Sequence, residues 1–208
     1  MTFSNPKILF VMAASAEYGA QLQQLIKPLM IGVGPVEAAV NLTAELANLT
    51  HQGKKPDLIV SLGSAGSQHL KQTEVYQAAS LSYRDMDASA LGFEKGTTPF
   101  LDIPAIVEME HFLSSVPKAS LSTGANIVSG EDYEAINAEM VDMESFAIWR
   151  VCEKFAMPMI GLRGISDGEK ELQQISDWTE YLHIIDEKLG LVLQEMKREF
   201  GGWQDCLA

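Results

Sequence analysis

Short apolar runs alternate along the chain with segments that have helical character. The runs are continuously hydrophobic, as in strands that are buried on both faces. They predict strands at residues 7–13, 28–34, 57–62, 75–83, 118–128 and 158–165. A polar segment predicts a helix at 17–26. Apolar residues spaced three to four positions apart predict helices at 36–49 and 142–156. A longer amphipathic stripe from Ile175 to Met196 predicts a closing helix that docks on the sheet.

This order of elements is typical of α/β proteins, in which helices cover a largely parallel sheet. Residues 85–104 are rich in Gly, Pro, Thr and Asp and are interpreted as a loop. The chain contains no internal repeat, low-complexity tract or linker-like segment. We therefore predict one α/β domain that spans residues 1–208.

The first apolar run has two interpretations. Lys7 precedes the run, and Ala14-Ser15-Ala16 has the small residues of a leader-peptide cleavage site. The run is at the short limit for such a leader, however, and the alternation that follows requires a first strand. We therefore interpret residues 7–13 as a buried strand that ends in a turn of small residues.

The net charge indicates which partners the protein can bind, and the cysteine content indicates the compartment in which we expect it. Lys and Arg total 15 against 28 Asp and Glu, which leaves a formal net charge of −13. This balance disfavours a nucleic-acid partner, because phosphate backbones require a basic face. No apolar run approaches the length of a membrane span, so we expect no membrane association. Two cysteines, Cys152 and Cys206, fit a reducing compartment, and we expect a cytoplasmic protein.

Several acidic and small residues follow the predicted strands, where ligands bind in sheets of this kind. They are Glu17, the Gly63-Ser64-Ala65-Gly66 segment, Glu131, and Asp167, while Glu144 lies at a predicted helix start. Each has a purely structural explanation as well, since Gly-rich segments form tight turns and carboxylates stabilise helix starts. The four histidines share no ligand spacing, and no nucleotide-binding or zinc motif occurs. We expect no metal and no cofactor.

Taken together and in order, these segments resemble the nucleoside phosphorylase/nucleosidase family. Within it they are most similar to the 5′-methylthioadenosine/S-adenosylhomocysteine nucleosidases. The resemblance runs from about residue 7 to residue 167 and is strongest at VDMESFAI (141–148), PMI (158–160) and RGISD (163–167). It continues at DLIVSLGSAG (57–66) and IVSG (127–130). Such a resemblance implies a three-layer αβα sandwich with a central mixed sheet, here somewhat trimmed.

The resemblance implies a purine nucleosidase with two catalytic carboxylates. Hydrolysis of an N-ribosidic bond builds positive charge on the sugar and negative charge on the departing base. Asp167 matches the acid that serves purine N7, and this role requires a partly desolvated carboxyl with a raised pKa. Glu17 matches the carboxylate that positions and deprotonates the attacking water.

The same resemblance assigns residues to the ribose and to the surroundings of the acid. Glu144 matches the carboxylate that holds the ribose hydroxyls, and Met143 a residue that packs on the ribose. Ser64 matches a serine near the nucleophile, Ser166 a residue that supports Asp167, and Arg163 an arginine behind the acidic site.

The remaining implied contacts concern the base and the 5′ substituent. Tyr133 lies at the spacing of the aromatic residue that stacks on the purine. The family's 5′ pocket borrows residues from a second subunit, so the resemblance implies a homodimer. Segment 87–93 matches that contribution, which assigns Leu91 and Phe93 to the neighbour's site.

The chain departs from the family pattern at several positions. The segment between Glu17 and Gly32 is short for the usual helix and strands, and the segment from Tyr133 to Val141 is short as well. Asp142 replaces the usual glutamate before the Met-Glu pair. These departures leave the reaction class plausible and put the nucleoside itself in question.

Three functions are compatible with the resemblance. A phosphorylase must bind a phosphate dianion, for which arginine is the natural side chain, yet no arginine precedes Arg84. The negative charge of Glu17 would also repel phosphate. A nucleoside-binding protein without turnover would not need Glu17, Glu144 and Asp167 together. We therefore expect a hydrolase, with the phosphorylase as the alternative and the binding protein as the second alternative.

Overall fold

The computed structural model describes residues 3–168 and 174–208 and contains one mixed sheet. All strands are β1 (Lys7–Met12), β2 (Leu29–Met30), β3 (Leu58–Gly66), β4 (Val75–Tyr83), β5 (Ile106–Glu108), β6 (Lys118–Thr123), β7 (Met140–Asp142), β8 (Met159–Asp167) and β9 (Gln204–Asp205).

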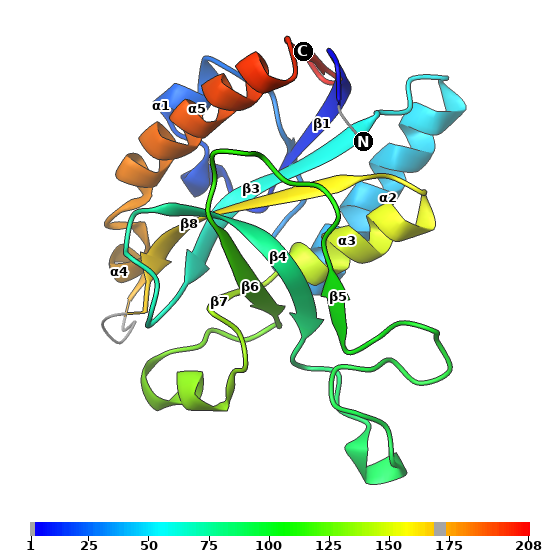
Figure 1. Ribbon diagram of the computed structural model, residues 1–208, viewed down its shortest axis with the longest axis vertical. Helices are drawn as coiled ribbons and strands as arrows, with labels where there is room; N and C mark the ends of the chain where they lie inside the picture. The colour runs from blue at the N-terminus through cyan, green and yellow to red at the C-terminus, as the bar shows by residue number, and fades with distance from the viewer. Residues whose placement is uncertain (1–2, 169–173) are drawn as a thin grey trace.

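Helices of different length connect these strands (Figure 1). The α-helices are α1 (Ala20–Gln23), α2 (Pro35–His51), α3 (Ser145–Lys154), α4 (Ile175–Thr179) and α5 (Leu182–Glu199). Three short 3₁₀ turns are η1 (Ser15–Glu17), η2 (Ser89–Leu91) and η3 (Gly130–Ala135).

The sheet closes on itself. Strand β8 pairs with β3 in parallel and with β4 in antiparallel orientation, and β4 continues through β6 to β7. The register of Gly66 with Val141 then joins β7 back to β3. The predicted α/β class with a central mixed sheet is confirmed, whereas the three-layer description stays a prediction.

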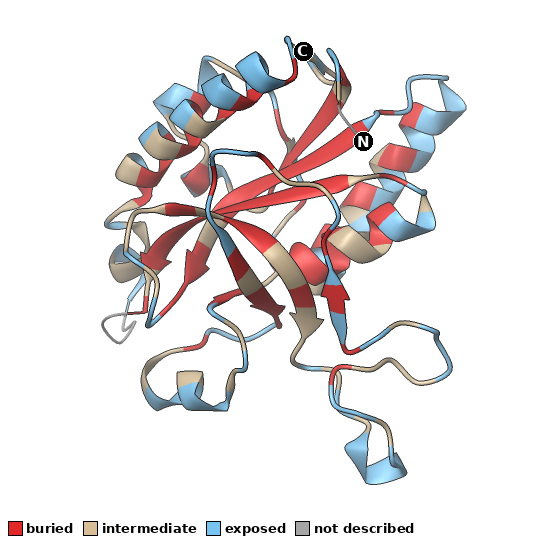
Figure 2. Cartoon of the chain, viewed as in Figure 1, coloured by how far each residue is buried: buried red, intermediate tan, exposed pale blue. Residues whose placement is uncertain are grey.

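Helices pack on both faces of the open part of the sheet, and the alternation of β1 shows why. Leu9 and Val11 point into a cluster with α2 and α3, whereas Ile8 and Phe10 point into a cluster with α1 and α5. Both faces of β1 are therefore buried, which explains its continuous apolar sequence (Figure 2).

The Gly63-Ser64-Ala65-Gly66 segment corrects a sequence prediction. We expected a tight turn after a strand that ends at Leu62, but the segment forms the last four residues of β3. It is held extended by pairing with β8, whose residues from Arg163 onward lie beside it. The small side chains allow other residues to lie close to this strand end, as described below.

Three predicted helices begin at another residue than expected or are interrupted. The helix predicted at 142–156 begins at Ser145, because Asp142 is taken into β7 opposite Thr123. The segment predicted as a helix at 17–26 consists of η1 and the single turn α1, with extended Gly19 between them. The closing stripe likewise divides into α4 and α5 around Tyr181.

Two predicted strands are shorter than expected. The strand predicted at 28–34 is reduced to Leu29–Met30, and the one predicted at 118–128 ends at Thr123. Residues 85–104 are irregular as expected apart from η2, and they project from the body of the molecule (Figure 1). Within residues 3–168 and 174–208, no helix combines the length and apolarity of a bilayer span.

Candidate active site

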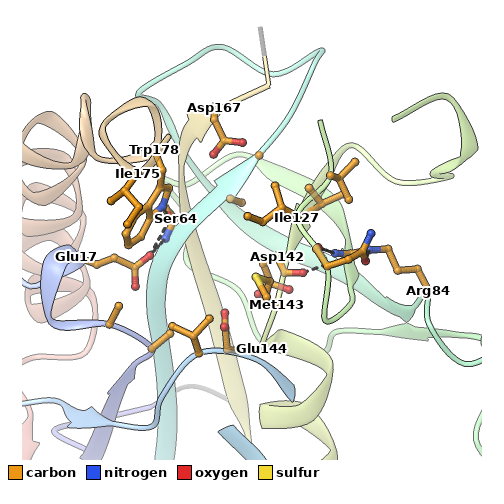
Figure 3. A pocket seen from close by; sticks show the side chains of 18 of the residues that line it. Glu17, Ser64, Arg84, Ile127, Asp142, Met143, Glu144, Asp167, Ile175 and Trp178 are labelled. Carbon is orange, nitrogen blue, oxygen red and sulfur yellow. Dashed lines mark hydrogen bonds between the residues drawn. The ribbon is translucent and has the colours of Figure 1, made fainter. Parts of the chain in front are cut away.

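A cavity of about 460 Å³ lies at the carboxyl ends of β1, β3 and β8, where sheets of this kind bind ligands. Its wall brings together residues that are distant in sequence, as Figure 3 shows. Among them are Glu17, Ser64, Met143, Glu144 and Asp167, all of which the sequence predicted for the site.

Glu17 lies in η1 directly after β1 and is 8% exposed. Its Oε1 atom accepts hydrogen bonds from the Ser64 backbone N–H and from Ser64 Oγ, both at 2.7 Å. Its Oε2 atom is buried and has no partner among the described residues. Burial raises the pKa of Glu17, while the Ser64 hydrogen bonds and the charge of Arg163 act in the opposite direction.

Glu144 precedes α3 and is 9% exposed. Its Oε1 atom accepts a 2.7 Å hydrogen bond from the backbone N–H of Gly34, which tethers the carboxylate to the start of α2. Burial, and next the charge of Asp142, raise the pKa of Glu144 to about 7. Met143 lies beside it on the cavity wall.

Asp167 is the last residue of β8 and is only partly buried. Burial raises its pKa, and a hydrogen bond donated by Ser166 Oγ to Asp167 Oδ1 opposes the rise. Ser166 itself is buried behind the cavity. A carboxyl group held this way keeps access to the cavity while part of it is desolvated.

Gly66 explains how two predicted residues meet at the end of β3. A Cβ atom at residue 66 would overlap the hydroxyl of Tyr133 and lie 2.8 Å from Asp167 Oδ2, so a side chain there would displace both groups. The Tyr133 hydroxyl is buried without a hydrogen-bond partner among the described residues. Tyr133 therefore approaches Asp167 with its hydroxyl, but its ring is not part of the cavity wall. The expected stacking on the purine stays a prediction.

Arg163 lies behind the cavity and not on its main wall. Its guanidinium forms an ion pair with Asp142 at 3.0 Å, in which both side chains are almost fully buried. It also donates to Ser61 Oγ at 3.0 Å and to Ser145 Oγ at 2.7 Å. Arg163 therefore ties β8, which ends in Asp167, to β3 and to the start of α3 beside Glu144.

Leu91 and Phe93 lie far from this cavity in the projecting 85–104 segment. Leu91 is 79% exposed, and neither residue lines the cavity. Phe93 packs edge-on against Phe100, which is itself exposed. Their predicted place in a neighbour's site stays a prediction.

Several cavity residues were not predicted from the sequence. Ile127 and Val128 form one wall and lie within the IVSG segment, so their motif was seen but their role was not. Ile175 and Trp178 on α4 form another wall, although their apolar spacing indicated only a helix that docks on the sheet. A spacing pattern cannot tell a residue that faces the core from one that faces a cavity.

Arg84 is a further residue of the cavity wall that was not predicted (Figure 3). It donates to the backbone carbonyls of Ser122, Asp142 and Asn126, at 2.6, 3.0 and 2.7 Å. These bonds link β6 and β7 to the segment that carries Ile127. Burial lowers the pKa of Arg84.

Metal ligands do not gather in the described part of the chain. No group of three or more His, Cys, Asp or Glu side chains in residues 3–168 and 174–208 is arranged to hold a metal ion. The expectation of a metal-free protein stays a prediction.

Comparison with known proteins gives the family. The 5′-methylthioadenosine/S-adenosylhomocysteine nucleosidase of Haemophilus influenzae (strain PittEE) is 31% identical over 186 residues, which cover 81% of this chain and 79% of the relative. The chain belongs to this nucleosidase family. A nucleosidase of Glaesserella parasuis is 27% identical and extends the match to 95% of the chain and 91% of the relative. No family model matches the chain.

Solved structures show the nucleosidase fold. The 5′-methylthioadenosine/S-adenosylhomocysteine nucleosidase of Colwellia psychrerythraea in complex with adenine has a TM-score of 0.77 at 21% identity, covering 96% of this chain and 98% of that one. A futalosine hydrolase mutant of Helicobacter pylori also has a TM-score of 0.77, at 20% identity, covering 93% and 99%. The resemblance inferred from the sequence is therefore confirmed.

Proposed function

We propose that this protein hydrolyses the N-ribosidic bond of 5′-methylthioadenosine- or S-adenosylhomocysteine-type nucleosides to free base and sugar. The observation that carries the proposal is the convergence of Glu17, Glu144 and Asp167 on one cavity in a chain of the nucleosidase family. Glu17 and Glu144 follow β1 and β7, and Asp167 ends β8, so the three carboxylates reach a substrate from different strands.

In this proposal Asp167 is the general acid. The departing purine carries negative charge, and a proton delivered to N7 makes it a competent leaving group. Partial burial raises the pKa of Asp167, which keeps more of the carboxyl protonated near neutral pH. The hydrogen bond from Ser166 fixes the orientation of the carboxyl at the end of β8.

Glu17 is proposed as the base that positions and deprotonates water. Ser64 occupies Oε1, which leaves the buried Oε2 atom as the acceptor for a proton of the nucleophile. A second cavity of about 10 Å³, lined in part by Glu17, Glu144 and Arg163, has room for one water molecule. Its polar lining supports the proposal that water enters there.

Glu144 and Met143 are proposed to hold the ribose. The Gly34 N–H fixes one carboxylate oxygen of Glu144 and leaves the other for sugar hydroxyls. A negative charge next to the sugar also stabilises the positive charge that develops in the transition state. The purine would then lie between the Ile127–Val128 wall and the Ile175–Trp178 wall, with Tyr133 behind Asp167.

Electrostatics disfavour phosphate as the nucleophile. Among the described residues, Arg84 is the one arginine on the wall of the larger cavity, and three of its hydrogen bonds go to backbone carbonyls. Arg163, beside Glu17, is paired with Asp142 and bonded to two serines. No free cation among the described residues therefore faces the place where a phosphate dianion would attack.

We expect cleavage of 5′-methylthioadenosine in phosphate-free buffer, with adenine and the free sugar as products. The measurement is chromatography of a nucleoside panel with and without phosphate, reading free base and ribose 1-phosphate. Strict phosphate dependence would establish the phosphorylase alternative. Tight nucleoside binding without release of any base would establish the binding protein.

The cavity is proposed to be completed by a second copy of the chain. Val33 lines the cavity and yet is 54% exposed, and Val36 and Val40 continue this apolar surface along α2 at 71% and 59% exposure. A surface of this kind is typical of a protein interface. Leu91 and Phe93 on the projecting segment are proposed to cover the neighbour's 5′ pocket.

Truncation of Phe93 to alanine should therefore remove the preference among 5′ substituents and leave the fold unchanged. The measurement compares kcat/KM for nucleosides with a methylthio group and with a free 5′ hydroxyl, together with sedimentation velocity. Leu191, exposed on α5, provides the matched alanine control. A fully active monomer at nanomolar dilution would rule out the shared site.

We also propose that the chain forms a single domain and that the protein is cytoplasmic. Both hydrophobic clusters include residues of β1, β3 and β8, so the two halves of the core share the same strands. Cys152 and Cys206 are both free thiols, which is consistent with a reducing compartment.

A further inference from the structure

A chain of hydrogen bonds runs from α4 to the base proposed for the reaction. Trp178 Nε1–H donates to Ser64 Oγ at 2.9 Å, and Ser64 Oγ donates to Glu17 Oε1 at 2.7 Å (Figure 3). We propose that Trp178 is a positioning residue for Glu17, acting through the hydroxyl of Ser64. The proposal rests on the function proposed above, in which Glu17 activates water.

The direction of each hydrogen bond follows from the donors that are present. Indole nitrogen can only donate, so the Ser64 hydroxyl must accept from Trp178. The hydroxyl has a single hydrogen, and with one lone pair engaged by the indole this hydrogen is directed at Glu17. The backbone N–H of Ser64 donates to the same Oε1 atom, so both bonds hold the carboxylate in one orientation. The other oxygen, Oε2, is thereby kept free for water.

Trp178 is placed by its own element. Gln174 and Asp177 form a reciprocal pair of hydrogen bonds that caps α4, and this cap fixes the start of the helix. The indole therefore reaches Ser64 from an element that is separate from both β1 and β3. A donor on α4 adds to the polarisation of the serine hydroxyl, because linked hydrogen bonds strengthen one another.

The charged groups around Glu17 determine how its pKa would respond to loss of the Trp178 N–H donor. The charge of Arg163 on β8 opposes the rise that burial causes in the pKa of Glu17, and the charge of Glu17 in turn raises the pKa of Glu144 at the start of α3. Asp186 on α5 accepts hydrogen bonds from the backbone N–H groups of Gln21 and Leu22 in α1, and Asp167 lies across the cavity. Because a polarised Ser64 hydroxyl favours the carboxylate form, loss of the indole N–H should raise the pKa of Glu17.

Trp178 also forms part of the cavity wall, and a test must separate this packing from the hydrogen bond. Trp178→Phe keeps an aromatic face and removes the N–H donor together with part of the bicyclic ring, a change in ring size that the control variant reproduces. We expect the acidic limb of the kcat/KM pH profile to move upward by about 0.3–1 pH unit. Little change is expected in KM at the plateau. Trp203→Phe, which alters a tryptophan that packs on Phe10 away from the cavity, is the matched control and should leave the profile unchanged.

Combination with Ser64→Ala tests whether the effect passes through the hydroxyl. In the Ser64→Ala background, Trp178→Phe should no longer move the acidic limb. An unchanged limb in the single Trp178→Phe variant, or a change in KM alone, would overturn the proposal and leave Trp178 as packing. An equal shift in both backgrounds would overturn it as well.

A readout without turnover keeps this proposal separate from the proposed function. The indole N–H resonance of Trp178, assigned by its absence in Trp178→Phe, should titrate with pH in the wild-type protein. The titration should disappear in Glu17→Gln and in Ser64→Ala. A flat resonance in the wild type would overturn the proposal even in an active enzyme. A titrating resonance in a protein that releases no base would support the hydrogen-bond chain and reject the proposed hydrolysis.

Discussion

Replacement of Asp167 by asparagine is expected to lower kcat about 10²- to 10⁴-fold, the usual contribution of a general acid. The amide keeps the shape of the carboxyl and can still form hydrogen bonds, but it cannot deliver a proton to the departing purine. Nucleoside affinity should therefore change little. Single-turnover rates and direct binding measurements separate the two quantities.

The pH profile gives a second signature of the same role. Asp167 must be protonated to act as the acid, so turnover should fall as the pH rises through its raised pKa. This alkaline limb should be absent from the residual activity of Asp167→Asn. Glu108→Gln, the same change of carboxylate to amide at an exposed position on β5 away from the cavity wall, is the matched control. Near-normal turnover of Asp167→Asn would exclude Asp167 as the acid and direct attention to Glu131 and Asp132.

Stability measurements show whether unfolding, and not loss of the acid, lowers the activity of Asp167→Asn. Burial raises the pKa of Asp167, so its contribution to stability is greatest at acidic pH and decreases as the pH rises through the folded-state pKa. Asparagine does not carry this desolvation cost. The melting temperature of Asp167→Asn at neutral pH should therefore equal or exceed that of the wild type.

Replacement of Arg163 by methionine should cause the largest loss of stability. The change leaves the Asp142 carboxylate buried without its cationic partner, and removal of one member of a buried ion pair costs about 3–5 kcal/mol. For a chain of this size the expected fall in Tm is roughly 6–20 °C. Calorimetry or chemical unfolding measures the change directly.

A double-mutant cycle identifies the cause of the loss. Asp142→Asn combined with Arg163→Met removes the uncompensated charge and should recover part of the stability. Arg150→Met disrupts the partly exposed pair with Glu153, and such pairs contribute about 0–1 kcal/mol. Similar losses in Arg163→Met and Arg150→Met would show that burial of the Arg163–Asp142 pair is unimportant.

The sequence located most elements because their signals are local. The apolar run of β1, the strand at Val75–Tyr83 and the helix that begins at Pro35 were predicted at or near their true bounds. The predicted element boundaries were wrong where pairing with a distant strand decided the conformation. Ser64 and Gly66 belong to β3 because β8 lies beside them, and no local pattern encodes that neighbour.

The same distinction holds for the candidate site. The order of the acidic residues and the RGISD and VDMESFAI segments determined the family and the cavity residues Glu17, Met143, Glu144 and Asp167. Only the tertiary structure decided what faces them. Trp178 reaches Ser64 across 114 positions of sequence, and its apolar spacing on α4 predicts burial without saying which partner its N–H meets. Hydrogen bonds between distant elements depend on how the sheet closes, and closure is a property of the whole chain.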